Sequence, residues 1–265
     1  MTLQNKDSLF PNEIHYKELG DTKSSKTLVF IHGATMTGAG LEPVAMLFSQ
    51  YHCILIDLPG HGSSLGKPEE TVEDIAEIVS TFLDTLREDR RISDDVTLLG
   101  YSMGGAVSIE NALKKKAYIK RMVIISSGAN LADYCPLISE TVKHGPDEFN
   151  SEEFFQQGFG SGTSPEEKSF LMNALSATKV DDRIGFSDLL SCSRYNKSDR
   201  VKELEIPVLI ITSDEDQIVL PECGIAFREA LQRSSIAVIP FRGHTAVFEM
   251  PEYTSEIIHR FLTNY

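Results

Sequence analysis

Short runs of apolar residues recur along this chain and alternate with stretches of helical periodicity. The run over residues 27–31 is apolar almost throughout and ends at polar positions. A continuous run of this length is typical of a strand buried on both faces of a parallel sheet. The same pattern predicts further strands, and weaker patterns predict a first and a last one. These strands are expected over residues 53–56, 96–99, 122–125 and 206–211, with 14–19 first and 236–240 last.

Between the runs, apolar residues recur at steps of three and four. Over residues 71–86, the positions Val72, Ile75 and Val79 fall on one face of a helix. Thr71 is a suitable N-cap, and acidic residues follow it in the first turn. Further helices are expected over 38–50, from Ser102 to about 116, and over 222–231 and 252–261. Strands that alternate with helices in this way predict an α/β fold with a doubly wound, mostly parallel sheet flanked by helices.

The rhythm changes between Ala129 and Arg200, where no strand-like apolar run occurs. We therefore expect a core built from residues 1–129 and 200–265, with a helical cap inserted over 130–199. The large apolar residues of this insertion either form a substrate pocket or pack against one another; they are Phe154, Phe155, Phe159, Phe170 and Leu171. Three glycines at 158, 160 and 162 either permit cap motion or form an ordinary flexible loop.

Residues 100–105 read Gly-Tyr-Ser-Met-Gly-Gly, between a predicted strand and a predicted helix. A sharp strand-to-helix turn crowds the backbone, and the glycines remove the side chains that would clash there. Ser102 would then stand exposed in a strained conformation, close to the free N–H groups at the positive end of the helix. The pattern therefore predicts a nucleophile elbow. A glycine-rich turn of another α/β protein is the alternative.

A serine hydroxyl needs a base to take its proton and an acid to orient that base. His244 lies just past the last predicted strand, and His32 also follows a strand, whereas His61 lies in a Pro-Gly-His-Gly turn. Ligands of such sheets bind beyond the carboxyl ends of the strands. Acidic candidates in strand-end loops are Asp214, Glu215 and Asp216, with Asp133 as the runner-up; the first three also fit a solvated acidic turn.

Composition excludes several functions. The chain has 265 residues, with 25 Lys and Arg against 39 Asp and Glu, which gives a formal charge of −14. An acidic surface repels phosphate backbones, so we expect no nucleic acid partner. Residues 1–11 are polar, and no run approaches the length of a transmembrane helix, so we expect no signal peptide and no membrane insertion. Four scattered cysteines favour a reducing, cytoplasmic location and show no zinc spacing.

The chain resembles the α/β-hydrolase-fold enzymes over roughly residues 14–265, apart from the cap. The matching segments appear in the family order: His32-Gly33, residues 57–63 (Asp-Leu-Pro-Gly-His-Gly-Ser), residues 100–105, residues 206–209 with 216–219, and Gly243-His244 with residues 249–252. The chain order of the triad in this fold is Ser, then Asp or Glu, then His.

This resemblance implies a role for each matching residue. Ser102 is the nucleophile, His244 is the general base, and Asp216 is the orienting acid because it precedes an Ile-Val pair as the family acid commonly does. The backbone N–H groups of Ala34 and Met103 form the oxyanion hole, and both residues are candidates to line the acyl pocket. Asp57 and His61 are assigned to a structural turn.

The implied function is a serine hydrolase of the carboxylesterase type, which cleaves a small ester without a metal or an organic cofactor. A hydrolase of an amide, thioester or carbon–carbon bond, or a perhydrolase, would have the same triad. A non-catalytic protein that binds a small molecule on the same fold is the alternative from another class.

Overall fold

The computed structural model describes residues 14–265, so the polar stretch at 1–11 lies outside the described residues. Seven strands form one sheet in the order β1-β3-β2-β4-β5-β6-β7. Only β1 runs antiparallel to its neighbour, which confirms the prediction of a mostly parallel sheet. The strands are β1 (Tyr16–Gly20), β2 (Thr27–Ile31), β3 (His52–Ile56), β4 (Val96–Tyr101), β5 (Ile119–Ile125), β6 (Val208–Ser213) and β7 (Ser234–Ile239).

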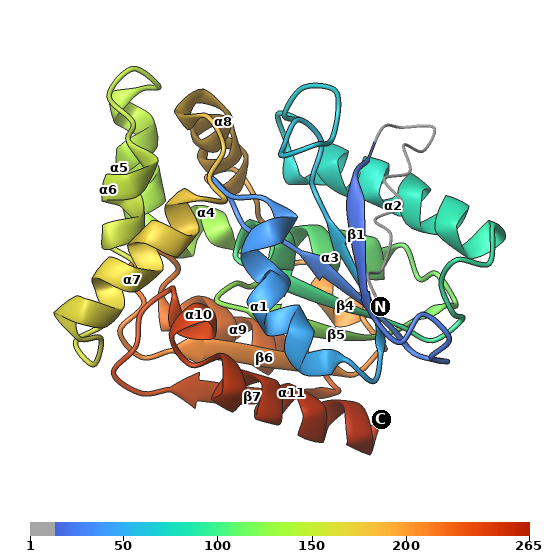
Figure 1. Ribbon diagram of the computed structural model, residues 1–265. Helices are drawn as coiled ribbons and strands as arrows, with labels where there is room; N and C mark the ends of the chain where they lie inside the picture. Colours follow the sequence, from blue (N-terminus) through green and yellow to red (C-terminus); the bar gives the residue numbers. More distant parts are fainter. Residues whose placement is uncertain (1–13) are drawn as a thin grey trace.

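Helices cover both faces of this sheet (Figure 1). The helices are α1 (Glu42–Ala45), α2 (Val72–Glu88), α3 (Met103–Leu113), α4 (Leu131–Tyr134), α5 (Pro136–His144), α6 (Ser151–Gln156), α7 (Pro165–Ser176), α8 (Asp182–Cys192), α9 (Pro221–Ala230), α10 (Ala246–Glu249) and α11 (Pro251–Asn264). Short 3-10 turns occupy Gly38–Leu41, Met46–Phe48 and Val201–Glu203.

The alternation of side chains along β2 divides the core into two layers. Val29 and Ile31 pack with residues of α2, α3 and α9, whereas Leu28 and Phe30 pack with residues of α1 and α11. Successive side chains of a strand point to opposite faces, so every position of this strand is buried. This burial on both faces explains why the strand reads as a continuous apolar run.

Some boundaries differ from those that the sequence predicts. Strand β5 begins at Ile119 rather than at 122, because Lys120 and Arg121 interrupt the apolar run. Strand β6 begins at Val208 rather than at 206, after Pro207, which has no N–H to donate to a neighbouring strand. The N-cap prediction for α2 is confirmed, since the Thr71 hydroxyl accepts the backbone N–H of Asp74 at 3.1 Å.

The segment between β5 and β6 contains the helices α4 to α8, which Figure 1 shows together toward one end of the sheet. Apolar side chains of this segment, among them Ile138, Phe149 and Leu189, belong to the same buried cluster as the sheet. Phe155 is also buried, but the side chain of Phe170 is 71% exposed. The prediction that Phe170 either forms a pocket wall or packs inside the cap is therefore wrong, because its position on α7 faces outward.

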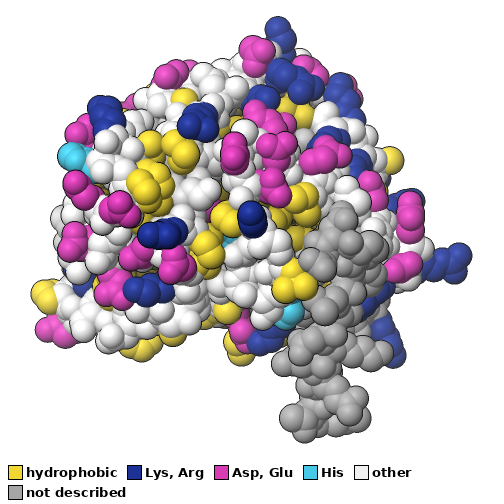
Figure 2. All heavy atoms as spheres, turned by 90° about the horizontal axis from the view of Figure 1, so that it is seen from above, with side chains coloured by type: hydrophobic (Ala, Val, Ile, Leu, Met, Phe, Trp, Pro, Cys, Tyr) yellow, Lys and Arg dark blue, Asp and Glu magenta, His cyan; other side chains and the backbone are white. Residues whose placement is uncertain are grey.

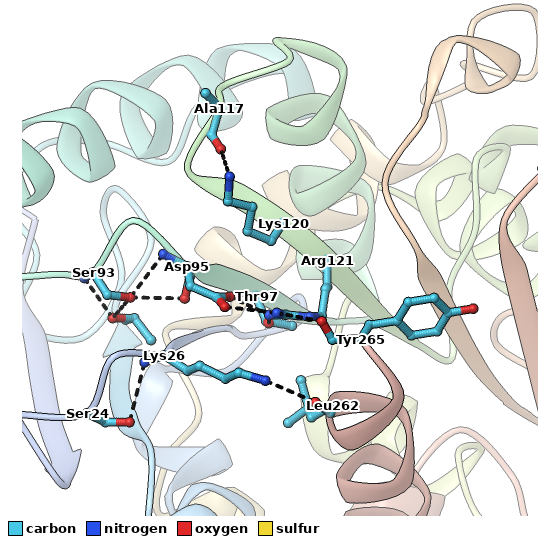
Figure 3. A network of polar contacts seen from close by, with 11 residues as sticks. Ser24, Lys26, Ser93, Asp95, Thr97, Ala117, Lys120, Arg121, Leu262 and Tyr265 are labelled. Carbon is cyan, nitrogen blue, oxygen red and sulfur yellow. Dashed lines mark hydrogen bonds and ion pairs between the residues drawn. The ribbon is translucent and has the colours of Figure 1, made fainter.

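A polar network lies at the amino ends of the strands, next to α11 (Figure 3). Arg121 is almost fully buried and pairs with the carboxylate of Asp95, with an Nη2–Oδ2 distance of 2.9 Å. The same guanidinium donates to the hydroxyl of Thr97 at 3.2 Å and to the carbonyl of Tyr265 at 3.1 Å. Lys26 donates to the carbonyl of Leu262 at 3.2 Å. These bonds connect α11 and Tyr265 to the amino ends of the strands.

Among the described residues, no helix combines the length and the apolar character that crossing a bilayer requires. The four cysteines are buried free thiols.

Candidate active site

Ser102 stands between β4 and α3 in a left-handed backbone conformation, with φ 51° and ψ −121°. This conformation is rare for a residue with a side chain, and such strain concentrates at functional sites. The flanking glycines make the turn possible. A Cβ on Gly104 would lie 2.1 Å from the carbonyl oxygen of Ile31, and a Cβ on Gly100 would lie 2.2 Å from that of Gly104.

The structure brings Ser102, His244 and Asp216 together from three separate loops. The distance from His244 Nε2 to Ser102 Oγ is 2.9 Å, and that from His244 Nδ1 to Asp216 Oδ2 is 2.8 Å. Asp216 is fully buried, and His244 and Ser102 are nearly so. The other carboxylate oxygen of Asp216 accepts the backbone N–H groups of Ile218 and Val219, both at 2.9 Å.

These contacts fix the roles of the ring nitrogens of His244. A carboxylate only accepts, so Nδ1 carries the proton that is donated to Asp216. Nε2 is then free to accept the hydroxyl proton of Ser102. The carbonyl of His244 accepts bonds from the hydroxyls of Tyr101 and Ser126, both at 3.3 Å. Burial and the nearby Asp216 carboxylate raise the pKa of Tyr101 well above its usual value, so this phenol stays a donor.

The two residues expected to form an oxyanion hole are Met103, next to Ser102 in the chain, and Ala34, in the loop after β2. Met103 is the first residue of α3, where backbone N–H groups have no partner within the helix. Ala34 follows β2, and its neighbour Gly33 is so close that a Cβ there would lie 3.0 Å from the Cβ of Ser102. Ala34 lines the cavity at Ser102, as expected; Met103 is buried, and its sulfur lies 3.8 Å from the hydroxyl of Ser191.

The structure gives the other acidic candidates different neighbours. Asp214 accepts the backbone N–H of Phe241 at 2.6 Å, and Glu215 accepts bonds from the backbone and hydroxyl of Ser161. Asp133 lies in the first turn of α4 and is bonded to Asn130, at 2.8 Å from its amide nitrogen. The ring of His244 thus has Asp216 as its carboxylate neighbour.

Asp57 and His61 have contacts within the turn to which the sequence assigned them. Asp57 accepts the backbone N–H groups of Gly38 at 2.9 Å and Ser63 at 3.0 Å. The Nδ1 atom of His61 lies 2.9 Å from the carbonyl of Pro59. His61 also has a partner outside this turn that the sequence did not predict, because its Nε2 lies 2.9 Å from Asp188 on α8.

His32, next to the turn, is fully buried and neutral. Its Nε2 accepts the backbone N–H of Leu58 at 2.9 Å, and its Nδ1 donates to the carbonyl of Gly33 at 2.8 Å. Burial, together with the neighbouring His61, lowers the pKa of His32 to about 4. His32 does not contact Ser102 and instead holds the loop after β2 against the turn after β3.

A small cavity reaches Ser102 and His244. Its volume is about 20 Å³, which is roughly the space of one water molecule. Its walls come from the core and from the cap, with Phe154, Phe155, Leu189 and Cys192 on the cap side. Phe154 also lines a wider groove of about 490 Å³ on the outside of α5 and α6. Phe154 and Phe155 thus fit both alternatives, because they line this cavity and also pack against the buried clusters.

The glycine-rich cap loop packs directly on the loop that carries His244. A Cβ on Gly243 would lie 2.2 Å from the carbonyl oxygen of Gly158, and that carbonyl accepts the N–H of Thr245 at 3.1 Å. A Cβ on Gly160 would lie 2.6 Å from backbone atoms of Arg242. A Cβ on Gly162 would lie 2.7 Å from the carbonyl oxygen of Phe241. Gly160 and Gly162 are thus required by close contact between backbones, a reason that differs from both alternatives drawn from the sequence.

The surface of the protein carries charges of both signs. On the face seen from above in Figure 2, acidic and basic side chains are interspersed, with apolar side chains between them. Within residues 14–265 the structure contains no group of three or more His, Cys, Asp or Glu side chains placed to hold a metal ion.

Several known proteins with similar sequences or structures are named as lipases, esterases or other hydrolases. The model of the alpha/beta hydrolase family matches residues 28–257. Lipase 3 of Moraxella sp. (strain TA144) is 23% identical over 245 residues, which cover 89% of this chain and 76% of that lipase. 2-Hydroxy-6-oxononadienedioate/2-hydroxy-6-oxononatrienedioate hydrolase 2 of Pseudomonas putida is 24% identical, over 94% of this chain and 91% of that enzyme. The crystal structure of a lipase-esterase related protein from Clostridium acetobutylicum ATCC 824 superposes with a TM-score of 0.84, at 26% identity, over 94% of this chain and 99% of that chain.

Proposed function

Because this chain belongs to the alpha/beta hydrolase family, we propose that it is a serine hydrolase that cleaves small carboxylic esters through Ser102, His244 and Asp216. The observation that carries this proposal is the unbroken chain of hydrogen bonds from the serine hydroxyl through the imidazole to the buried carboxylate. A serine becomes nucleophilic when a base accepts its proton, and these distances are suitable for that transfer.

In the proposed reaction, Ser102 Oγ attacks the ester carbonyl carbon while its proton passes to His244 Nε2. The carbonyl oxygen becomes an oxyanion that the N–H groups of Ala34 and Met103 stabilise, a contribution of roughly 3–4 kcal/mol per donor in comparable enzymes. His244 then protonates the departing alkoxide, which leaves as the alcohol. A water molecule, deprotonated by His244, hydrolyses the acyl-enzyme and restores Ser102.

The preference for a small ester follows from the size of the cavity. A cavity of about 20 Å³ next to Ser102 holds no more than about one water molecule, so an acyl group enters only if a wall residue such as Phe154 moves, and the shortest acyl groups need the smallest movement. The cap itself, with boundaries proposed at 130 and 199, is then the part of the chain that limits substrate size. The names of the lipase and lipase-esterase relatives support an ester substrate. The name of the oxononadienedioate hydrolase keeps hydrolysis of other bonds as the second candidate.

The test is hydrolysis of p-nitrophenyl esters from acetate to decanoate by the wild type and Ser102→Ala. We expect hydrolysis that is fastest for the shortest esters, and a loss of about 10⁵–10⁶-fold in kcat for Ser102→Ala. Ser126→Ala is a matched control, because Ser126 is also buried, also left-handed and also bonded to the His244 backbone. This control should retain at least a tenth of the rate, since its hydroxyl takes no part in the chemistry.

Two results would contradict the proposal. One is a Ser102→Ala variant that hydrolyses esters as fast as the wild type. The other is a wild type that neither hydrolyses any ester nor reacts with a fluorophosphonate probe, which would favour a non-catalytic binding protein. Labelling without ester hydrolysis would point to another scissile bond.

A further inference from the structure

Asp188 is a cap residue that reaches into the core next to the proposed oxyanion hole. It lies on α8 and is 1% exposed. Its Oδ2 accepts the backbone N–H of Thr35 at 2.9 Å and lies 2.9 Å from Nε2 of His61. Its Oδ1 is buried and has no hydrogen-bond partner within the described part of the chain. A buried carboxylate is energetically costly, so both bonds of Oδ2 serve to hold it in place.

The residue that Asp188 holds is strained. Thr35 has φ 67°, which is a genuine outlier for a β-branched side chain. Thr35 directly follows Ala34, whose N–H group is the proposed oxyanion donor. The direction of the Ala34 N–H depends on the backbone angles of this loop, so a bond that stabilises the strained form of Thr35 also orients that donor. Strain of this kind persists only where the surroundings enforce it.

Other contacts from the same part of the cap hold the same loop. The carbonyl of Thr35 accepts the N–H of Val180 at 3.1 Å, and the N–H of Thr37 donates to the carbonyl of Thr178 at 3.0 Å. Met36 and Lys179 form an antiparallel bridge between them. The loop after β2 is therefore paired with a cap segment along its length, and Asp188 is the side chain that adds a charge to this pairing.

His61 is the second partner of the Asp188 carboxylate. The ring nitrogens of His61 face the Pro59 carbonyl and the Asp188 carboxylate, and both of these groups accept hydrogen bonds. A ring that donates from both nitrogens is an imidazolium, so these contacts favour the protonated form of His61. Burial by itself would lower the pKa of His61, but the Asp188 carboxylate and its hydrogen bond raise it above its usual value. The two residues form a buried ion pair that links α8 to the turn after β3.

We infer that Asp188 is a positioning residue for ester hydrolysis, which holds the Thr35 backbone so that the N–H of Ala34 points at the oxyanion. This inference rests on the proposed function. The cap then has two roles, because it limits substrate size and also completes the catalytic geometry. Asp188 lies 86 residues after Ser102 in the chain. The oxyanion exists in the transition state and not in the bound ester, so loss of Asp188 affects kcat rather than KM.

The experiment compares Asp188→Ala, Asp188→Asn and Asp182→Asn in the full-length protein. We expect kcat to fall roughly 100-fold in Asp188→Ala, the effect of one lost oxyanion donor, with KM changed less than threefold. Asp188→Asn keeps an oxygen that can accept the Thr35 N–H, so it should recover at least a tenth of the wild-type kcat. Asp182 is the matched control, because it lies on the same helix and bonds only cap residue Ser151, at 2.6 Å.

Two further readouts separate positioning from general damage. The acid limb of the kcat pH profile should stay at the same pH in Asp188→Asn, because the partners of His244 are unchanged. Hydrogen exchange of the peptide that contains Thr35 should speed up in Asp188→Ala and not in Asp182→Asn. This exchange measurement is independent of activity, so it tests the loop contact even if no ester is hydrolysed and the proposed function fails.

The inference is overturned if folded Asp188→Ala keeps the wild-type kcat, or if its exchange rate at Thr35 is unchanged. Equal losses in Asp188→Ala and Asp182→Asn would also overturn it, since they would indicate damage to the cap as a whole.

Discussion

The two ends of the parallel strands use polar groups in opposite ways. At the carboxyl ends, four residues other than glycine have left-handed backbones just after β2, β4, β5 and β7; they are Thr35, Ser102, Ser126 and Phe241. The buried groups there include histidines and carboxylates, which are hydrogen-bonded to one another and to backbone groups of the loops. At the amino ends, the buried Arg121 has a carboxylate, a hydroxyl and a C-terminal carbonyl as partners (Figure 3).

This difference shows that backbone strain lies at the carboxyl ends of the strands, whereas hydrogen bonds and an ion pair stabilise the amino ends. The other described residues with left-handed backbones, apart from glycines, are Arg90 and Lys115, which follow the helices α2 and α3, a common place for such a conformation. The strain on the strand-end loops has no comparable role in ending a helix. We therefore expect changes at the carboxyl ends to alter activity first and changes at the amino ends to alter stability first.

The largest effect that would sharpen this comparison is expected for Asp216→Asn. The asparagine oxygen would still accept the N–H groups of Ile218 and Val219, so its NH2 group would face Nδ1 of His244. The ring would then carry its proton on Nε2, where it cannot accept the proton of Ser102. The equivalent change in a serine protease lowers kcat about 10⁴-fold, and we expect a loss of about this size in ester hydrolysis.

The control for this variant is Asp214→Asn, two residues earlier, where the carboxylate accepts a backbone N–H of the exposed Phe241. Its rate should stay within a factor of about five of the wild type. A loss in Asp214→Asn as large as that in Asp216→Asn would reassign the acid. Thermal unfolding of both variants shows whether the fold is intact, and we expect similar midpoints for the two.

The next effect belongs to the amino ends. Arg121→Met removes four hydrogen bonds to three residues and leaves the Asp95 carboxylate without its guanidinium partner, so we expect the free energy of unfolding to fall by about 3 kcal/mol. Urea unfolding measures this loss. Activity of the folded variant should equal that of the wild type, since the site is at the other end of the strands.

Arg87→Met is the matched control for the amino end, because Arg87 pairs with the exposed Asp94 on the surface. Exposed pairs contribute about 0.2–1 kcal/mol, so this variant should be nearly as stable as the wild type. If Arg121→Met lowered kcat of folded protein tenfold or more, the division between the two ends of the strands would be wrong.

Most of the sheet and the positions of the proposed triad could be predicted from the sequence, because the signals for them lie in residues that are neighbours in the chain. Buried parallel strands are continuous apolar runs, and the turn at Ser102 requires glycines at fixed positions. Where local signals were mixed, the predictions were less accurate. Arg121 interrupts an apolar run, and the polar partners that bury it are far away in the sequence, so β5 starts earlier than its apolar part.

The contacts between cap and core were beyond sequence reasoning for a different reason. Asp188 contacts Thr35, which is 153 residues away in the chain, and His61, which is 127 residues away. Patterns of neighbouring residues do not predict contacts between positions so far apart. The available signal was a carboxylate between Phe186 and Leu189, inside an apolar stretch of helix, where a buried charge needs a partner. The opposite error was made at Phe170, which was predicted to be covered and is exposed. An aromatic residue in a helix does not by itself show which face of that helix is covered.

The last effect concerns the dependence of stability on pH, which separates the two ends again. His32 is neutral when folded because its pKa is lowered to about 4, whereas in the unfolded chain a histidine titrates near 6.5. Between these two values the unfolded chain binds a proton that the folded protein does not. The free energy of unfolding is therefore not lowered by His32 above about pH 6.5, and it falls by about 3 kcal/mol as the pH drops to about 4. The raised pKa of His61 acts in another window, since its stabilisation is present below about pH 6.5 and is lost as the pH rises through the folded value.

His32→Gln tests this, because an amide oxygen can accept the Leu58 N–H and does not titrate. We expect His32→Gln to be less stable than the wild type at pH 7 but to lose less stability between pH 6.5 and 4.5, as measured by urea unfolding at intervals of half a pH unit. Arg121→Met is the informative comparison, because arginine keeps its charge throughout this range and its removal should lower stability without changing the slope. An unchanged slope in His32→Gln would show that the acid sensitivity of the fold does not arise at the carboxyl ends of the strands.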